Sequence, residues 1–139
     1  MRQCTTNITV NTRGAGLYEF TRELVSWVAD SGISEGLLTL FIRHTSASLT
    51  VQENADPDVQ DDLADAFDRL APAGRGLYRH AAEGPDDMPA HIKAALSDVS
   101  LSIPVMGGRP ALGTWQGVYV FEHRTSAHRR TVSCHLLGA

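Results

Sequence analysis

The stretch LLTLFIRHTSASLTVQENADPDVQDDL, residues 37–63, combines two strand patterns, a polar connection and a helix start. Its first six residues, 37–42, are almost entirely apolar and have the length of a buried strand. Leu49 and Val51 then alternate with polar neighbours, which predicts a second strand paired to the first around the connection at residues 44–47. The stretch therefore predicts adjacent strands followed directly by a helix.

That helix has a clear N-terminal signal. Asp56 is a good capping residue, and Pro57 occupies a position where no amide hydrogen is needed. Apolar residues at helical spacing predict its buried stripe, which consists of Val59, Leu63, Phe67 and Leu70. The acidic residues in its first turn suit the positive end of the helix dipole.

The residues before this stretch indicate one more strand and one more helix. Residues 4–12 include an alternating segment typical of a half-buried strand. An amphipathic helix is predicted over residues 17–30, ended by Gly32. Its apolar positions are Leu17, Phe20, Leu24 and Val28.

The residues after the stretch indicate a loop, a short helix and further strands. Residues 71–87 are rich in Gly, Pro and Asp and predict a long ordered loop, a kind of segment that often has a function. The short helix lies around Pro89 and directs Met88, Ile92 and Leu96 inward. The predicted strands cover residues 99–105, 117–123 and 130–137. We therefore expect an α+β fold with an antiparallel sheet or sandwich and about three packed helices, in one domain over residues 1–139.

Composition bounds the function. The 139 residues are 42% hydrophobic and 20% charged, which is enough for a globular core, and the net charge of −4 argues against a nucleic-acid partner. No run approaches the ~18 apolar residues of a membrane span, and the first ten residues contain no apolar signal core. We expect a cytoplasmic protein without a membrane partner. The absence of P-loop, GxGxxG, CxxC, HExxH and GxSxG motifs removes the usual support for several enzyme classes.

Four of the six histidines stand at predicted element ends beside other polar groups: His44, His80, His91 and His123. Neutral imidazole is the commonest metal ligand, and carboxylates complete many three-ligand sites. His80 and His91 flank the acidic loop and are eleven residues apart, so the loop can fold both onto one ion. The alternative is that each histidine forms only local hydrogen bonds.

Two further polar groups suggest ligand contacts. Glu53 shares a strand face with Leu49 and Val51, which predicts an inward carboxylate that serves as a ligand or general base. Asn54 either holds substrate or closes the turn. The segment GTWQG, residues 113–117, offers close backbone approach and an aromatic stacking plane, or else a β-bulge with a core Trp.

Together these segments resemble the secondary thiamine-phosphate synthase family, the YjbQ-like proteins. The matching stretches are FIRHTSASLTVQENADPDVQDDL, YRHAAEGPDDMPAHIKAAL, SLSIPV, GRPALGTWQGVYVFEHR and RRTVSCHLLG. They cover almost everything from residue 36 to the C-terminus. Relatives often have a cysteine where this chain has Ala55, so a thiol role is not expected there.

The resemblance implies an antiparallel α+β fold, usually a homotrimer, that joins a pyrimidine pyrophosphate to a thiazole phosphate and releases pyrophosphate. We expect a metal-assisted enzyme acting on a small phosphorylated molecule, with Zn or Mg as the divalent ion. The expected catalytic residues are His44, Glu53 and Asp87, the expected metal ligands are His80, His91 and His123, and the expected substrate contacts are Ser46, Asn54, Thr114, Trp115, Gln116 and Arg124. The alternative is a trimeric module that binds a phosphorylated metabolite or metal ion without turnover.

Overall fold

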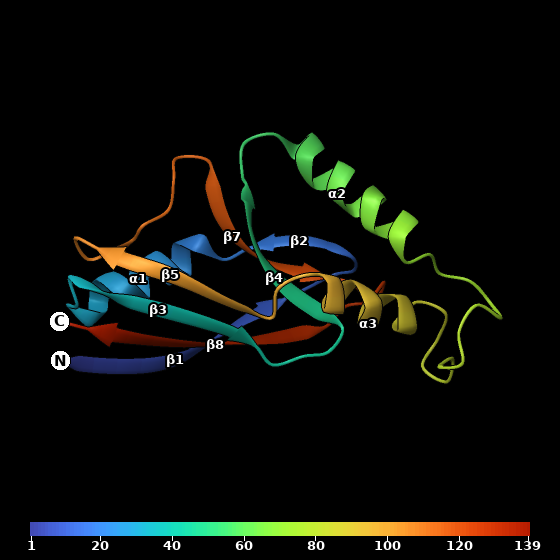
Figure 1. The fold of residues 1–139 in the computed structure, drawn as a ribbon, viewed down its shortest axis with the longest axis horizontal. Coiled ribbons are helices and arrows are strands. Elements are labelled where there is room, and N and C mark those ends of the chain that lie inside the picture. The colour runs from blue at the N-terminus through green and yellow to red at the C-terminus, as the bar shows by residue number, and fades with distance from the viewer.

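The computed structural model describes residues 1–139 as two antiparallel sheets with three helices, which confirms the expected α+β class (Figure 1). The strands are β1 (Arg2–Asn11), β2 (Gly16–Glu19), β3 (Glu35–Ile42), β4 (Ala47–Glu53), β5 (Ser100–Met106), β6 (Arg109–Pro110), β7 (Gln116–Glu122) and β8 (Arg129–Gly138). The helices are α1 (Thr21–Ser31), α2 (Pro57–Leu70) and α3 (Asp87–Leu96). None of these helices has the length and apolar character that a membrane crossing requires.

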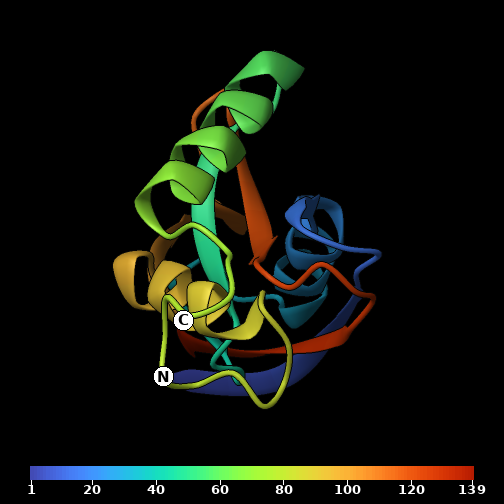
Figure 2. The same ribbon diagram turned by 90° about the vertical axis from the view of Figure 1, so that its right-hand side faces the viewer.

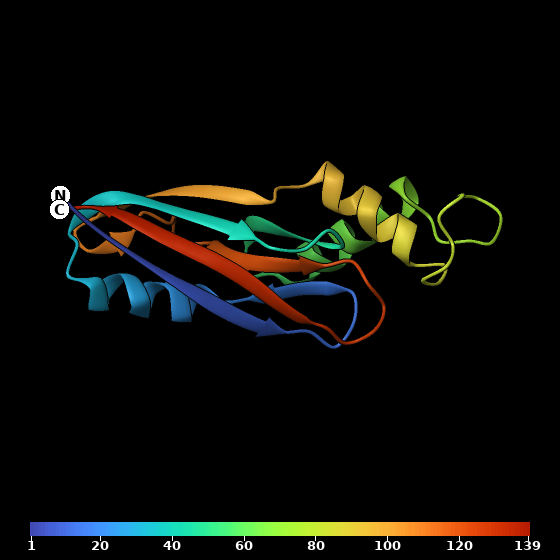
Figure 3. The same ribbon diagram turned by 90° about the horizontal axis from the view of Figure 1, so that it is seen from below.

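The larger sheet has the strand order β1-β8-β3-β5-β6, and the smaller sheet has the order β2-β7-β4. The core contains buried residues of both sheets, such as Leu38, Leu136, Leu49 and Val120, together with Leu24 of α1. Figure 3 shows the long strands of the larger sheet side by side, with α1 along one half of the molecule and α3 at the opposite end. The two ends of the chain lie together, because Arg2 pairs with Gly138.

The expected pairing of the two strands in residues 37–63 is wrong. β3 pairs with β5 and β8, whereas β4 pairs with β7 in the other sheet. The connection at residues 43–46 therefore carries the chain from one sheet to the other. Alternation and apolar runs report which residues are buried, but they do not report which strand is the neighbour.

The predicted helix over residues 17–30 begins later than expected, at Thr21. Residues 16–19 form β2 instead, and Leu17 pairs with Phe121 of β7. Pairing with an existing strand satisfies the backbone groups of this segment, which overrides a helical spacing that local sequence alone favours. The predicted C-cap is confirmed, because Gly32 adopts a left-handed conformation with φ of 71°.

The predicted inward faces of the other two helices need correction. In α2 the cap at Asp56 is confirmed, since its side chain accepts a hydrogen bond from the amide of Asp58. Its apolar stripe is only partly covered, however, and Leu70 is 66% exposed. In α3 the small residues Ala90 and Ala94 face inward, whereas Leu96 is 58% exposed. Small side chains let α3 lie close to β4, a packing that the apolar spacing of residues 88, 92 and 96 did not indicate.

Gly36 and its partner Gly138 mark a very close backbone approach in the larger sheet. Gly36 belongs to β3, which has neighbours on both sides, and it pairs with Gly138 of β8 and Val105 of β5. A Cβ atom at residue 36 would overlap the carbonyl oxygen of Leu137 and the Cα of Gly138. Neither obstacle is a flexible side chain, so the sheet itself must shift to accept one.

We predict that Gly36→Ala lowers the free energy of unfolding by about 1–3 kcal/mol, the usual cost of forcing an extra methyl group into a packed region. Gly113→Ala is the matched control, because its Cβ would lie 3.4 Å from the nearest atom, an ordinary contact. Urea denaturation of both variants measures the difference. Equal stability of the two variants would contradict this account of the central strand.

Candidate functional site

Most of the predicted polar residues gather at one end of the two sheets. Figure 2 looks onto this end, where α3 and the loop before it lie in front and α2 stands alongside. The contributing segments are the connection after β3, the start of α3, and the end of β7 with the start of β8. Their side chains form two neighbouring groups, one around Asp87 and one around Glu122.

Asp87 is the centre of the first group. Its carboxylate is almost fully buried, and its Oδ2 lies 2.6 Å from Nε2 of His80 and 3.0 Å from Nε2 of His91. Asp87 and His91 are four residues apart on α3, a spacing that places both on the same helix face. His80 reaches them from the loop, so that the three potential ligand atoms lie within 4.8 Å of one another.

The backbone determines which nitrogen of His91 carries hydrogen. Nδ1 of His91 lies 2.9 Å from the carbonyl oxygen of Thr45, which can only accept, so Nδ1 must be the donor. In the neutral ring Nε2 is then a bare lone pair, and it faces the Asp87 carboxylate. Two lone pairs at this distance need a cation or a proton between them. A carbonyl that fixes one ring nitrogen in this way is typical of metal-binding histidines.

Arg124 holds the other side of this carboxylate. Its Nη1 lies 2.8 Å from Oδ1 of Asp87, its Nε donates to Asp86, and its Nη2 donates to the carbonyl of Glu83. Burial alone would raise the pKa of Asp86, but hydrogen bonds from Thr125 and Arg124 lower it to about 2. All three nitrogens of the guanidinium thus contact groups of the protein itself. Arg124 therefore positions Asp87 and is not free to bind a substrate.

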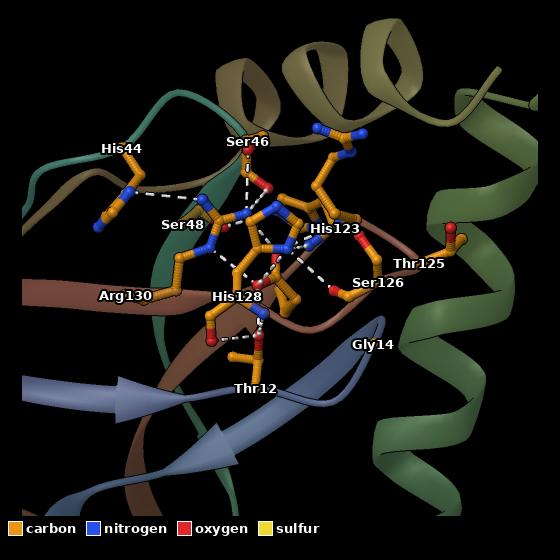
Figure 4. Close-up of polar contacts among 12 residues, drawn as sticks. Thr12, Gly14, His44, Ser46, Ser48, His123, Thr125, Ser126, His128 and Arg130 are labelled. Carbon is orange, nitrogen blue, oxygen red and sulfur yellow. Dashed lines mark hydrogen bonds and ion pairs between the residues drawn. The ribbon is translucent and has the colours of Figure 1, made fainter. Parts of the chain in front are cut away.

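Glu122 is the centre of the second group, shown in Figure 4. It is fully buried, and its carboxylate accepts two hydrogen bonds from Arg130 and one from the hydroxyl of Thr12. Its Oε2 also accepts from the amides of His123 and Arg124. Although burial opposes ionisation, the hydrogen bonds from Arg130 and Thr12 lower the pKa of Glu122. The group is therefore a buried ion pair that links β7 to β8.

His44 and Ser46 lie beside this ion pair. Arg130 points toward both residues (Figure 4), and its Nη2 donates to Oγ and to the carbonyl of Ser46. Nε2 of His44 accepts the amide hydrogen of Thr131 at 2.8 Å, while its Nδ1 lies 3.4 Å from Nη1 of Arg130. Burial and the charge of Arg130 lower the pKa of His44. His44 is therefore a neutral ring with a fixed orientation.

His123 is placed away from the His80–Asp87–His91 group. Its Nε2 lies 2.9 Å from Oγ of Ser48, which lies 2.7 Å from Oγ of Ser97. Ser97 donates its only hydrogen to a backbone carbonyl, so Ser48 must donate to Ser97 and accept from His123. A serine that accepts from histidine is not an activated nucleophile. This arrangement fixes the orientation of His123, whose ring packs against Phe67 and Phe121, two rings that also contact each other.

The remaining predicted residues lie at the opposite end of β4, and the structure does not bring them to the histidines. The amide of Asn54 donates to the carbonyl of Trp115, and Glu53 accepts from the amide of Asp56, which closes the turn before α2. Gln116 pairs with Glu53 across the strands. Six strand steps separate this end from the start of β4, which corresponds to about 20 Å. Thr114 belongs to the same turn as Trp115, whose side chain is 63% exposed.

The ion pair of Glu122 and Arg130 was not predicted, although the sequence contains a signal for it. Arg130 has the same strand parity as Val132, Cys134 and Leu136, and all four side chains are buried. Glu122 ends the continuous buried run of β7. A charged residue in phase with apolar strand positions indicates a buried partner, and the two predicted strands contain one acid and one base in such positions.

We predict that His123 makes the protein less stable in acid. Burial and the nearby charge of Lys93 lower the pKa of His123 from 6.5 to about 3, so the unfolded chain binds a proton throughout this pH window while the folded chain does not. This group alone therefore removes about 1.4 kcal/mol of stability for each unit that pH falls within the window. Urea unfolding between pH 7 and pH 5 should give a flatter profile for His123→Gln than for the wild type, and identical profiles would contradict the assignment.

Comparison with known proteins places this fold and these segments in a family. The model of the YjbQ family, described as UPF0047 protein YjbQ-like, matches residues 6–139. UPF0047 protein sll1880 of Synechocystis is 50% identical over 131 residues, which cover 94% of this chain and 89% of that protein. UPF0047 protein YjbQ of Escherichia coli O157:H7 is 42% identical, with 94% and 95% covered.

Solved structures agree with the sequence relatives. An uncharacterized conserved protein of the YjbQ/UPF0047 family from Clostridium acetobutylicum is similar with a TM-score of 0.86 at 34% identity, covering 95% of this chain and 99% of that one. The conserved hypothetical protein TT1486 from Thermus thermophilus gives a TM-score of 0.85 at 36% identity, with the same coverage. On these matches, the chain belongs to the YjbQ (UPF0047) family.

Proposed function

We propose that this protein binds a divalent metal ion through His80, Asp87 and His91 and uses the site to act on a small phosphorylated molecule. The observation that supports the proposal is the orientation of His91, whose Nδ1 contacts the Thr45 carbonyl so that its Nε2 faces the buried carboxylate of Asp87. Without an ion, the Nε2 atoms of both imidazole rings converge on one oxygen atom of Asp87. A cation satisfies all three atoms at once.

The donor set favours zinc over magnesium. Two imidazole nitrogens and one carboxylate suit zinc, whereas magnesium prefers oxygen ligands and retains its water. Ligands about 2.0–2.1 Å from a tetrahedral ion lie roughly 3.3 Å apart. The nitrogen–oxygen distances of 2.6 and 3.0 Å therefore need to open by about 0.7 and 0.3 Å. Because His80 is on a loop and partly exposed, this small opening requires no change in the core.

The residues around the ion have separable roles in this proposal. Arg124 fixes Asp87, and Thr45 fixes the ring of His91. A bound ion would polarise a phosphate oxygen or lower the pKa of a bound water. His44 directly precedes Thr45, whose carbonyl contacts His91. Its neutral imidazole is the remaining candidate for acid–base assistance.

Thiamine phosphate synthesis is the activity that we propose for this site, on the basis of the resemblance in the sequence motifs. It requires a pyrimidine pyrophosphate, a thiazole phosphate and the release of pyrophosphate, all of which suit a site for a cation and anions. Binding without turnover is the second candidate. It is favoured by the internal engagement of Arg124 and by the position of Glu53 at the far end of β4.

We also propose that the protein is a homotrimer, as the resemblance implies. Trp115 and the neighbouring Glu53 lie too far from Asp87 to join it within one chain, but a second copy can bring them there. The apolar stripe of α2 is only partly covered, and Trp115 is 63% exposed, so both offer surface for such a contact. Light scattering should then give three times the chain mass of 15.0 kDa.

We predict one zinc ion for each chain after dialysis against excess zinc and then against zinc-free buffer, measured by mass spectrometry of the metal. His91→Ala and Asp87→Asn should each weaken zinc affinity by more than about tenfold, because each removes a ligand. His135→Ala is the matched control, since its ring contacts Gln3 in the larger sheet. Substoichiometric zinc that is equal in the wild type and in His91→Ala would contradict the metal site.

We predict that the zinc-loaded protein forms thiamine phosphate from the two precursors in a coupled assay and that Asp87→Asn does not. Thermal shift in the same solutions separates the alternatives, because a ligand raises apparent stability by mass action whether or not it reacts. Stabilisation without product supports the binding module. The absence of both product and stabilisation would contradict both candidates.

A further inference from the structure

We propose that His44 and Arg130 form a binding site for a tetrahedral oxyanion, such as a phosphate group, whose oxygen atoms accept hydrogen bonds from Nδ1 of His44 and Nη1 of Arg130. The site is separate from the three groups proposed to hold metal. As an anion site it depends only on its own geometry. As the place of a substrate phosphate it rests on the proposed function.

The ring of His44 supplies the first donor. The amide of Thr131 can only donate, and it lies 2.8 Å from Nε2, so Nε2 must be the acceptor. Burial and the positive charges of Arg130 and Arg43 oppose protonation and lower the pKa of His44. The ring is therefore neutral with its hydrogen on Nδ1. Nδ1 of His44 is a donor.

The guanidinium of Arg130 supplies the second donor, and its side chain is only 4% exposed. Its Nε and Nη2 donate to Glu122, and Nη2 also donates to Ser46. The only hydrogen-bonding neighbour of Nη1 is Nδ1 of His44, at 3.4 Å. Since both nitrogens carry hydrogen, this contact is not a hydrogen bond. Two donors lie side by side and neither has an acceptor.

An oxyanion satisfies this arrangement better than any group of the protein present there. Its oxygen atoms accept from both donors at once, and one of the donors is charged. Oγ of Ser46 accepts from Arg130 and has no acceptor of its own, so its hydrogen is available as a third. Arg43 adds positive charge near His44, while Glu122 lies behind the guanidinium, fully buried. His44 is only half-buried, so its ring is partly accessible to solvent.

The position of this site explains how it can serve a phosphorylated molecule. Thr45 follows His44 directly, and its carbonyl holds the ring of His91. One short connection, residues 43–46, therefore borders both the oxyanion site and the proposed metal ligands. A molecule whose phosphate binds at Arg130 can present a neighbouring polar group toward Asp87.

The test is isothermal titration of metal-free protein with inorganic phosphate. His44→Gln is the decisive variant, because the glutamine oxygen can replace Nε2 as acceptor for Thr131 while nothing replaces the Nδ1 donor. We expect His44→Gln to weaken phosphate binding by about tenfold or more, since a hydrogen bond to a charged group is lost. His128→Gln is the matched control, because Nδ1 of His128 already contacts the carbonyl of Ser126.

Several outcomes are decisive. Equal phosphate affinity of His44→Gln and wild type, or no binding by a folded wild type at millimolar phosphate, would overturn the oxyanion site. His91→Ala should bind phosphate as the wild type does. If His91→Ala loses zinc binding but retains phosphate binding, the two sites are separate. If the wild type binds phosphate but takes up no zinc, the oxyanion site is supported and the metal site is overturned.

Discussion

The buried ion pair between Glu122 and Arg130 is the interaction on which the end of the molecule with the candidate site depends. It joins the last residue of β7 in the smaller sheet to the start of β8 in the larger one. Removing one partner of such a pair costs about 3–5 kcal/mol, whereas replacing both with apolar groups is often neutral. Its contribution is therefore mainly positional. The amides of His123 and Arg124 bind to Glu122, and Arg124 in turn holds Asp87.

The same constraint unites the two proposed sites. On one side, Arg124 fixes the buried carboxylate that His80 and His91 share. On the other side, the amide of Thr131 fixes the ring of His44 beside Arg130. The connection between β3 and β4 lies between them because the chain changes sheets there, and its carbonyl and hydroxyl groups complete both sides. The crossing between sheets thus places backbone groups that no strand pairs at the two proposed sites.

Local residues were enough to predict the helix cap at Asp56, the Gly32 terminus and the strand patterns, because these depend on neighbours in the chain. The partner of β4 and the strand β2 depend on pairing with β7, which lies about a hundred residues from β2. The convergence of His80 and His91 was expected from the acidic loop between them, but Asp87 was expected as a catalytic residue and His123 as the third ligand. The separation of Glu53 from that group required knowing that β4 runs away from the site, which no spacing in the sequence reveals.

The central proposal is that a cation lies between Nε2 of His91 and the carboxylate of Asp87. Anomalous diffraction at the zinc absorption edge, from crystals grown with zinc, tests it most directly. We expect an anomalous-difference peak about 2.0–2.2 Å from Nε2 of His80, Nε2 of His91 and Oδ2 of Asp87. The absence of a peak there, with His91 still hydrogen-bonded directly to Asp87, would contradict it.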